Sequence, residues 1–270
     1  MTINSRIFGQ AALPAVLFGA VAAFGLTSTS LSRAGEAQSP GSFVENFDKL
    51  DTSRWYISDG WTNGKHQNCT WSKHQVSVKD GVLNLGFAKE QTKDRAYACS
   101  EIRTKQRYGY GTYEVRMKTA AGPGLDLSFF TYIGETDKQP HDEIDFEVLG
   151  KNPSKVQLNY FTGGKGGHEQ LVEVPGGADA DFHDYAFVWE KDRIRWYIDG
   201  KLVRTVDNPG GLPSHPSNIF MNVWGSDTLS GWLGRFAEPS EPLKLQIERV
   251  AFTAPGDHCQ FPESIACSLD

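Results

Sequence analysis

Residues 141–150 read HDEIDFEVLG and place an acid at every second position from Glu143 to Glu147. Side chains alternate between the two faces of a β-strand, so Glu143, Asp145 and Glu147 would all point to one side. A helix would scatter the same acids over its surface. The pattern therefore predicts a strand with three carboxyl groups in a row on one face. The residues between the acids would form its apolar face: Ile144, Phe146 and Val148.

The rest of the chain alternates in the same way. Residues 76–87 and 193–206 each contain two apolar runs around an Asp-Gly dipeptide, which fits the type I′ turn of a β-hairpin. Residues 111–119, GTYEVRMKT, alternate between apolar and charged side chains. Sustained helical periodicity is absent, and 28 Gly and 13 Pro interrupt the sequence. These features predict one all-β domain, either a sandwich or a barrel.

Two further predicted strands, residues 155–162 and 217–224, have one apolar face and one mixed face. A face that only meets water would carry mainly Lys, Glu, Thr and Ser. Aromatic rings instead stack on pyranose rings, while amides and acids bind sugar hydroxyls. A second core layer with a polar rim is the alternative, but the composition favours a sugar site. The mixed faces carry Gln157, Asn159, Phe161, Phe220, Asn222 and Trp224.

Three explanations compete for the acids of residues 141–150. A solvated edge strand fits poorly, because the flanking residues are apolar. A calcium cluster fits poorly too, because the segment has no D-x-D-x-D-G turn. Catalysis uses the repulsion, since adjacent carboxyl groups cannot all ionise and one stays protonated beside an ionised neighbour, as glycoside hydrolysis requires. Backbones four residues apart on a strand are roughly 13 Å apart, so the spacing alone does not choose between retention and inversion.

Residues 1–34 are predicted to be a secretory signal peptide. Arg6 is the one charged residue among the first ten, and residues 11–26 are almost wholly apolar. Ser32 and Ala34 occupy the −3 and −1 positions of an A-x-A-like cleavage site. An uncleaved membrane anchor is the alternative, but the apolar run is short and contains Gly and Pro. We therefore expect a secreted protein whose mature domain spans residues 35–270.

The charge of the chain argues against several partners. Removal of residues 1–34 takes away two arginines and no acid, so the formal net charge changes from −6 to −8. An acidic protein without a Lys/Arg cluster is a poor candidate for binding nucleic acid or an anionic membrane. A neutral polysaccharide is the expected partner, and the protein is expected to be a monomer.

Four cysteines remain in the mature chain, and an even number in an oxidising compartment predicts two disulfides. Three pairings are formally available, and order along the chain favours Cys69–Cys99 and Cys259–Cys267. The second would tie down a tail formed by residues 255–270. A zinc site is the alternative, but neither C-x-x-C nor H-x-x-x-H spacing is present.

The acid stretch, DEIDFE followed by VLG, resembles the E-x-D-x-E signature of glycoside hydrolase family 16. The likeness extends over residues 61–253 through the blocks NCTW, YGYGTYEVRMK, SFFTY, MNVWG and GWLG, which are similar to blocks of bacterial licheninases. Within the family, the sequence is most similar to secreted endoglycanases that process bacterial exopolysaccharide such as succinoglycan.

The resemblance implies a β-jelly-roll sandwich of two antiparallel sheets with a concave substrate cleft, and retention of anomeric configuration. It makes Glu143 the nucleophile, Glu147 the general acid/base and Asp145 a helper. Cys69 and Cys99 match a disulfide of the licheninases. Residues that match sugar-contacting positions of the cleft are Asn63, Glu101, Arg103, Tyr132, Asn159, Trp224 and Trp232.

Several positions depart from the licheninase pattern. In the N-terminal cleft loop, Trp61 stands in place of Tyr and Gln67 in place of Phe. His141 stands where these enzymes have Trp, and Phe161 stands where they have Tyr, so both are assigned to altered subsite walls that bind substrate. The family's structural calcium uses an acid near the end of the last strand, and Glu248 stands there in place of Asp. No cofactor is expected for catalysis, and the calcium site is left open.

The sequence thus predicts a secreted endo-β-glycanase. Its expected reaction is hydrolysis of β-1,3-1,4-type glucosidic linkages in a β-glucan or bacterial exopolysaccharide by double displacement. Two alternatives remain: a transglycosylase, which would pass the same intermediate to a sugar, and a non-catalytic, lectin-like jelly roll.

Overall fold

The computed structural model describes residues 40–269, so the predicted signal peptide lies outside the described residues. None of the helices in this part is long and apolar enough to cross a membrane. The strands are β1 (Phe43–Glu45), β2 (Trp55–Ile57), β3 (Cys69–Trp71), β4 (Val76–Lys79), β5 (Val82–Lys89), β6 (Tyr97–Thr104), β7 (Gly111–Lys118), β8 (Leu125–Ile133), β9 (Asp142–Leu149), β10 (Lys155–Phe161), β11 (Gln170–Glu173), β12 (His183–Trp189), β13 (Arg193–Ile198), β14 (Lys201–Asp207), β15 (Asn218–Gly225) and β16 (Leu243–Thr253). The helices are short: α1 (Ser230–Leu233) and the 3₁₀ turns η1 (Lys73–Gln75), η2 (Glu135–Asp137) and η3 (Ile265–Ser268).

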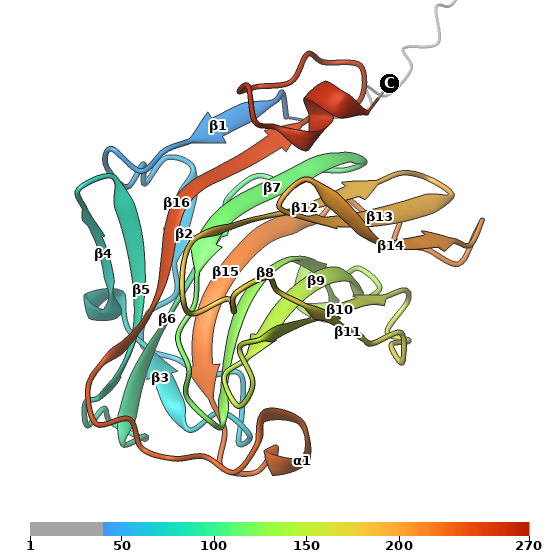
Figure 1. Cartoon of the computed structure of the whole chain (residues 1–270). Coiled ribbons are helices and arrows are strands. Elements are labelled where there is room, and N and C mark those ends of the chain that lie inside the picture. Colours follow the sequence, from blue (N-terminus) through green and yellow to red (C-terminus); the bar gives the residue numbers. More distant parts are fainter. Residues whose placement is uncertain (1–39, 270) are drawn as a thin grey trace, which may run out of the picture. The chain divides into compact units, whose positions relative to one another are not determined.

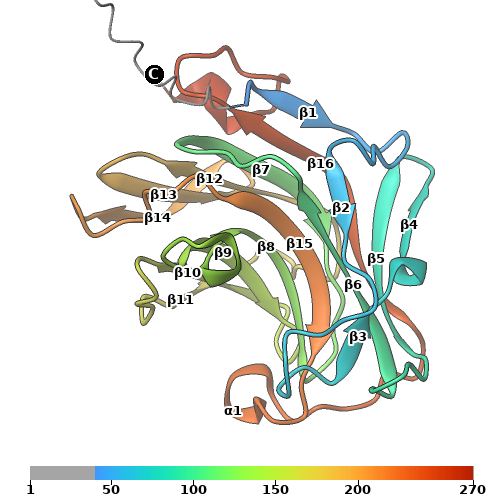
Figure 2. The same ribbon diagram turned by 180° about the vertical axis from the view of Figure 1, so that it is seen from behind.

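The strands form two curved layers that pack face to face, as Figures 1 and 2 show. The inner layer has the order β11-β10-β9-β8-β15-β6, and the outer layer has the order β5-β16-β7-β12-β13-β14. This is the predicted jelly-roll arrangement, with β9 between β8 and β10 in the interior of the inner layer.

Two details differ from a pair of separate antiparallel sheets. The layers are continuous, because β5 pairs with β16 over most of its length and then with β6 through Ala88 and Lys89. The short strand β3 pairs with β6 in parallel. A strand of eight residues is long enough to change partners, and sequence alternation alone cannot reveal where it does so.

The two predicted hairpin turns are present. Asp80 and Gly81 have φ of 53° and 76°, and Asp199 and Gly200 have φ of 48° and 73°. Positive φ at both central residues is the type I′ geometry, which Asp-Gly adopts at low cost. The turns therefore set the pairing of β4 with β5 and of β13 with β14.

The apolar face of β9 packs into the core between the layers. Ile144, Phe146 and Val148 are fully buried, and the Phe146 ring lies 5.3 Å from that of Tyr185 on β12. Burial of one such side chain contributes about 1.5–3 kcal/mol. A slip of one residue would push the acids into the core, so this packing fixes the register that points them outward.

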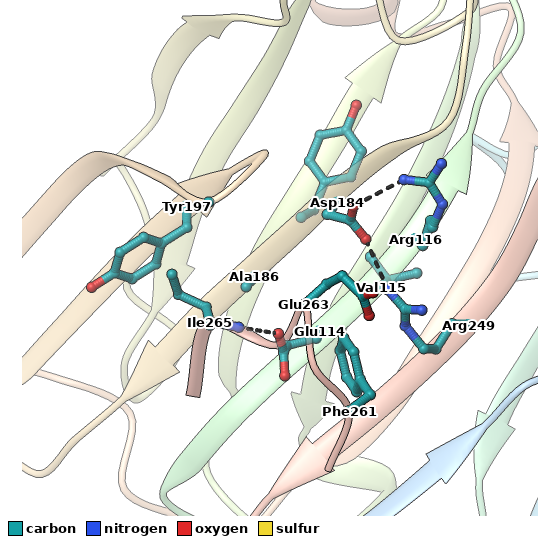
Figure 3. Close-up of a pocket in the computed structure, with 12 residues that line it drawn as sticks. Glu114, Val115, Arg116, Asp184, Ala186, Tyr197, Arg249, Phe261, Glu263 and Ile265 are labelled. Carbon is teal, nitrogen blue, oxygen red and sulfur yellow. Dashed lines mark hydrogen bonds and ion pairs between the residues drawn. The ribbon is translucent and has the colours of Figure 1, made fainter. Parts of the chain in front are cut away.

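Both predicted disulfides are present. Cys69–Cys99 links β3 to β6, and Cys259–Cys267 closes a loop in the C-terminal tail. The tail packs on the outer layer, where Ser264 Oγ donates to one carboxylate oxygen of Glu114 at 2.6 Å. The Ile265 amide donates to the other at 2.8 Å (Figure 3).

Candidate active site

The inner layer carries an open cavity of about 950 Å³ on its concave face. Side chains of β6, β8, β9 and β15 line its floor, and the segment before β3 and helix α1 add to its walls. Both predicted catalytic glutamates, Glu143 and Glu147, line it. Seven of the nine predicted substrate-binding residues also line this cavity: Asn63, Glu101, Arg103, Tyr132, Phe161, Trp224 and Trp232.

Glu143 lies at one end of the acid row and contacts a histidine. His141 Nε2 is 2.5 Å from Glu143 Oε2, and the His141 ring stacks on Phe161 with centroids 4.7 Å apart. The hydrogen bond to Glu143 raises the pKa of His141, against the opposing effect of burial. His141 was predicted to bind substrate, but its side chain contacts Glu143 and does not line the cavity.

Asp145 lies between the two glutamates, 1% exposed. Within residues 40–269, neither of its oxygens meets an N–H or hydroxyl donor. Burial, followed by the charges of Glu143 and Glu147, raises its pKa well above the usual range. A hydrogen bond with Glu143 raises this pKa further, so the environment favours the protonated carboxyl group.

Glu147 lies at the other end of the row in a different environment. Gln157 Nε2 donates to its Oε2 at 2.6 Å, and Trp232 Nε1 in turn donates to Gln157 Oε1 at 3.3 Å. Burial raises the pKa of Glu147 well above its usual range, and the charges of Asp126 and Glu143 raise it further. Glu147 therefore holds a proton where an ordinary glutamate would have lost it.

A fourth carboxyl group, Asp126 on β8, lines the cavity and was missed from the sequence. Its Oδ2 accepts a hydrogen bond from Trp224 Nε1 at 3.0 Å and another from Ser128 Oγ. Burial raises the pKa of Asp126 to about 7. The sequence LDLSFF of residues 125–130 could have indicated Asp126, because an acid is unusual in a strand that is otherwise mostly apolar.

Other cavity residues are aromatic; Trp61 and Phe220 were singled out in the sequence, whereas Tyr56 and Phe130 were not. Tyr56 and Trp61 are two of the four exposed large hydrophobic residues among those described, and both face the cavity. Phe130 and Phe220 stack with centroids 5.0 Å apart on its floor. Asn159, predicted to bind sugar, lies opposite Asp145 and does not line the cavity.

Glu101 and Arg103 were correctly predicted to lie in the cleft. Glu101 accepts hydrogen bonds from Ser58 at 2.7 Å and from Asn222 at 3.1 Å, while burial raises its pKa. The Arg103 guanidinium lies 4.8 Å from the centre of the Tyr56 ring. Both side chains come from β6, on the opposite side of the floor from the acid row.

Glu248 was the candidate calcium ligand and lies at a bulge of β16, on the outer layer. Its carboxylate accepts from Arg116 Nε at 2.8 Å, so the chain's own cation neutralises it. Among the described residues, no group of three or more His, Cys, Asp and Glu could hold a metal ion. Glu248 is thus paired with an arginine in this structure, and a calcium site built on it stays a prediction.

Known proteins share this fold and these motifs. A family model for glycosyl hydrolases family 16 matches residues 63–239. The chain is 58% identical over 229 residues to endo-1,3-1,4-beta-glycanase ExoK of Rhizobium meliloti (strain 1021), covering 85% of each chain. It is 40% identical over 231 residues to the beta-glucanase of Bacillus subtilis (strain 168), covering 85% of this chain and 91% of the relative.

Among solved structures, the Bacillus licheniformis beta-glucanase matches with a TM-score of 0.76 and 41% identity, covering 80% of this chain and 100% of the other. The jelly roll and its acid-lined cleft define a glycosidase with a polysaccharide substrate. The chain belongs to glycosyl hydrolases family 16, whose glycosidases need no cofactor for catalysis.

Proposed function

We propose that this protein is an endo-β-glycanase that hydrolyses β-1,3-1,4-type linkages with retention of configuration. Its substrate would be a β-glucan or a bacterial exopolysaccharide such as succinoglycan. The observation that carries the proposal is the contrast between two glutamates of one strand, because Glu143 is paired with an imidazole and Glu147 is kept protonated by burial and by other acids. The similarity to an endo-1,3-1,4-beta-glycanase and to a beta-glucanase supports the linkage type.

The first step would use both glutamates. A carboxylate oxygen of Glu143 attacks the anomeric carbon while the bond from that carbon to the glycosidic oxygen breaks. The electron pair of the broken bond goes to the leaving oxygen, which takes the proton of Glu147. The products are a glycosyl ester on Glu143, an ionised Glu147 and a shortened polymer with a free hydroxyl.

The second step requires Glu147 to accept a proton, and the loss of charge on Glu143 explains why it can. The charge of Glu143 is one of the causes that raise the pKa of Glu147. Esterification removes this charge, so the pKa of Glu147 falls when its role changes from acid to base. Water, deprotonated by Glu147, then attacks the anomeric carbon and releases Glu143.

The protonated Asp145 would support both steps. It is buried between the glutamates and shares its hydrogen bond with Glu143. A donor at this place stabilises the carboxylate that leaves when the ester is hydrolysed. His141 donates to Glu143 as well, so two groups fix the direction of the nucleophile.

The cavity suits a polymer cut in its interior. It is open rather than enclosed, and its lining includes the aromatic rings of Trp61, in the segment before β3, and Trp232, on α1. We further infer that the protein is secreted, in keeping with residues 1–34 and the two disulfides.

The test is to incubate the purified protein with mixed-linkage β-glucan, β-1,3-glucan, cellulose and succinoglycan, and to identify the released fragments by mass spectrometry. We expect oligosaccharides from mixed-linkage glucan or succinoglycan, and none from a Glu143→Gln/Glu147→Gln double variant. Binding without product would leave a lectin. Products longer than the substrate, formed only with added acceptor oligosaccharides, would indicate a transglycosylase.

A further inference from the structure

Asp126 lies beside Glu147 on the neighbouring strand. Ser128 of β8 pairs directly with Glu147 of β9, and Asp126 is two residues away on the same face. Asp126 is therefore a diagonal neighbour of Glu147, and such neighbours have Cβ atoms roughly 7 Å apart. Carboxyl groups on side chains of this length can approach closely across the cavity that both residues line.

The Asp126 side chain is fixed at this place. It is 2% exposed, and Trp224 Nε1 and Ser128 Oγ both donate to its Oδ2. Its Oδ1 is buried and, within residues 40–269, meets no donor. Glu101, a second buried acid of the same cavity, has donors at both oxygens. Asp126 is thus held in place while its charge is only partly compensated.

We propose that Asp126 is a positioning residue for the acid/base Glu147. The negative charge of Asp126 keeps on Glu147 the proton that bond cleavage requires. This inference rests on the proposed function. It assigns a role to a residue outside the E-x-D-x-E motif, carried by a different strand.

The groups that face Glu147 support this role, because none of them is a cation. Asp126 faces it from β8, Glu143 and Asp145 from β9, neutral Gln157 from β10, and Glu169 from the segment that follows β10. No salt bridge to Asp126 is present in the described part of the chain.

The two carboxyl groups influence each other's titration. Burial is the main cause that raises the pKa of Asp126 to about 7 and the pKa of Glu147 well above its usual range. The charge of Asp126 is the next cause for Glu147. An ionised Asp126 therefore opposes ionisation of Glu147, and the two carboxyl groups titrate as a coupled pair.

The experiment measures the pH dependence of kcat/KM for wild type and Asp126→Asn on the polymer that the wild type cleaves. Asn keeps the size of the side chain and an oxygen acceptor for Trp224 Nε1 but has no charge. The basic limb reports the acid of the free enzyme. We expect it to move to lower pH by about one unit, the size of one nearby charge in a partly buried site.

Glu101→Gln is the matched control. It also removes a buried carboxyl group from this cavity, but from β6, and Glu101 is not among the charges that raise the pKa of Glu147. We expect it to change KM and leave the basic limb in place. An equal shift in both variants, or no shift in Asp126→Asn, overturns the proposal.

His141 also titrates, so its contribution to the pH dependence of kcat/KM must be distinguished from that of Glu147. A substrate with an activated aryl leaving group makes this distinction. Cleavage of this substrate needs no proton from Glu147, so the limb that Asp126 moves should be absent from kcat/KM. If the basic limb persists with this aryl substrate and still moves in Asp126→Asn, it belongs to another group, and this result contradicts the proposal. If Asp126→Asn does not fold, Ser128→Ala replaces it, and loss of the hydroxyl should move the limb in the same direction by less.

The outcomes for the two claims are distinct. If the wild type releases no product from any glycan, the proposed function fails. If it cleaves its polymer normally and the basic limb is unmoved in Asp126→Asn, the function stands and the role of Asp126 fails alone.

Discussion

The glutamates at the two ends of β9 differ in the side chains that contact them, and this difference separates their chemistry. Glu143 has an imidazole against it, at 2.5 Å from His141 Nε2. Glu147 has an amide against it, at 2.6 Å from Gln157 Nε2, and is otherwise surrounded by acids. Two glutamates four residues apart therefore lie in different electrostatic environments, and that of Glu147 raises the pKa of its carboxyl group. The difference comes from neighbouring strands and loops, because both belong to the same alternating motif.

The outer layer shows how acids are paired where no reaction is proposed, at buried Glu114 and at partly exposed Asp184. Glu114 receives two hydrogen bonds from the C-terminal tail, and Asp184 forms ion pairs with Arg116 and Arg249 (Figure 3). These acids are compensated, whereas Asp145 and Asp126 keep oxygens without donors. Buried carboxyl groups without donors cost stability, so their concentration in the cleft points to function.

Substitution of either Glu143 or Glu147 should have the largest effect on kcat. Glu143→Gln and Glu147→Gln each keep the side chain's size and are expected to lower kcat at least about a thousandfold. Binding of oligosaccharide, measured by calorimetry, should survive in both. Turnover near the wild-type value in either variant would contradict the assignment of that residue.

Asp145→Asn tests the group between the ends. Asn can still donate a hydrogen bond but cannot lose or gain a proton, so we expect kcat to fall about ten- to a hundredfold. Asn159→Ser is the control, because Asn159 lies directly opposite Asp145 on β10 and outside the cavity. The account requires the loss in kcat to be clearly larger for Asp145→Asn.

His141→Gln should lower kcat about tenfold, because Glu143 loses the group that orients it. The pKa of His141 is raised in the folded protein, so its charge is fully present below its unfolded value of 6.5 and is lost as pH rises through the folded value. The ratio of wild-type to variant kcat should therefore be largest at low pH. A ratio independent of pH would show that the imidazolium charge has no part in the effect.

The outer layer should respond in stability and not in rate. Cys259→Ser/Cys267→Ser opens a loop with a sequence separation of 8. A loop of this size predicts a loss of about 2 kcal/mol in the free energy of unfolding, measured by urea denaturation. The value of kcat should not change, and a change would mean that the tail influences the cleft.

The sequence predicted those features that short stretches determine. Asp80-Gly81 and Asp199-Gly200 form the expected turns because positive φ is a local property of these residues. The acid strand and its faces followed from alternation. The pairing of Asp126 with the Glu147 end did not, because nothing local reveals which strand lies beside β9.

Long-range packing explains the other differences. Glu114 was predicted on the charged face of its strand, yet the tail buries it from 150 residues away. His141 was assigned to a subsite wall, but its ring turns onto Glu143 and Phe161. The contacts of Glu114 with the tail and of His141 with Phe161 join residues that meet only after the strands pair and pack.

Azide rescue tests the central claim most directly, because it asks which face of the sugar each end of β9 occupies. Glu143→Ala and Glu147→Ala are each given an activated aryl β-glycoside and sodium azide, and the products are identified by NMR. We predict an α-glycosyl azide from Glu143→Ala, since azide takes the place of the nucleophile, and a β-glycosyl azide from Glu147→Ala. The reverse pattern, or the same anomer from both variants, would contradict the assignment of opposite roles to the two ends.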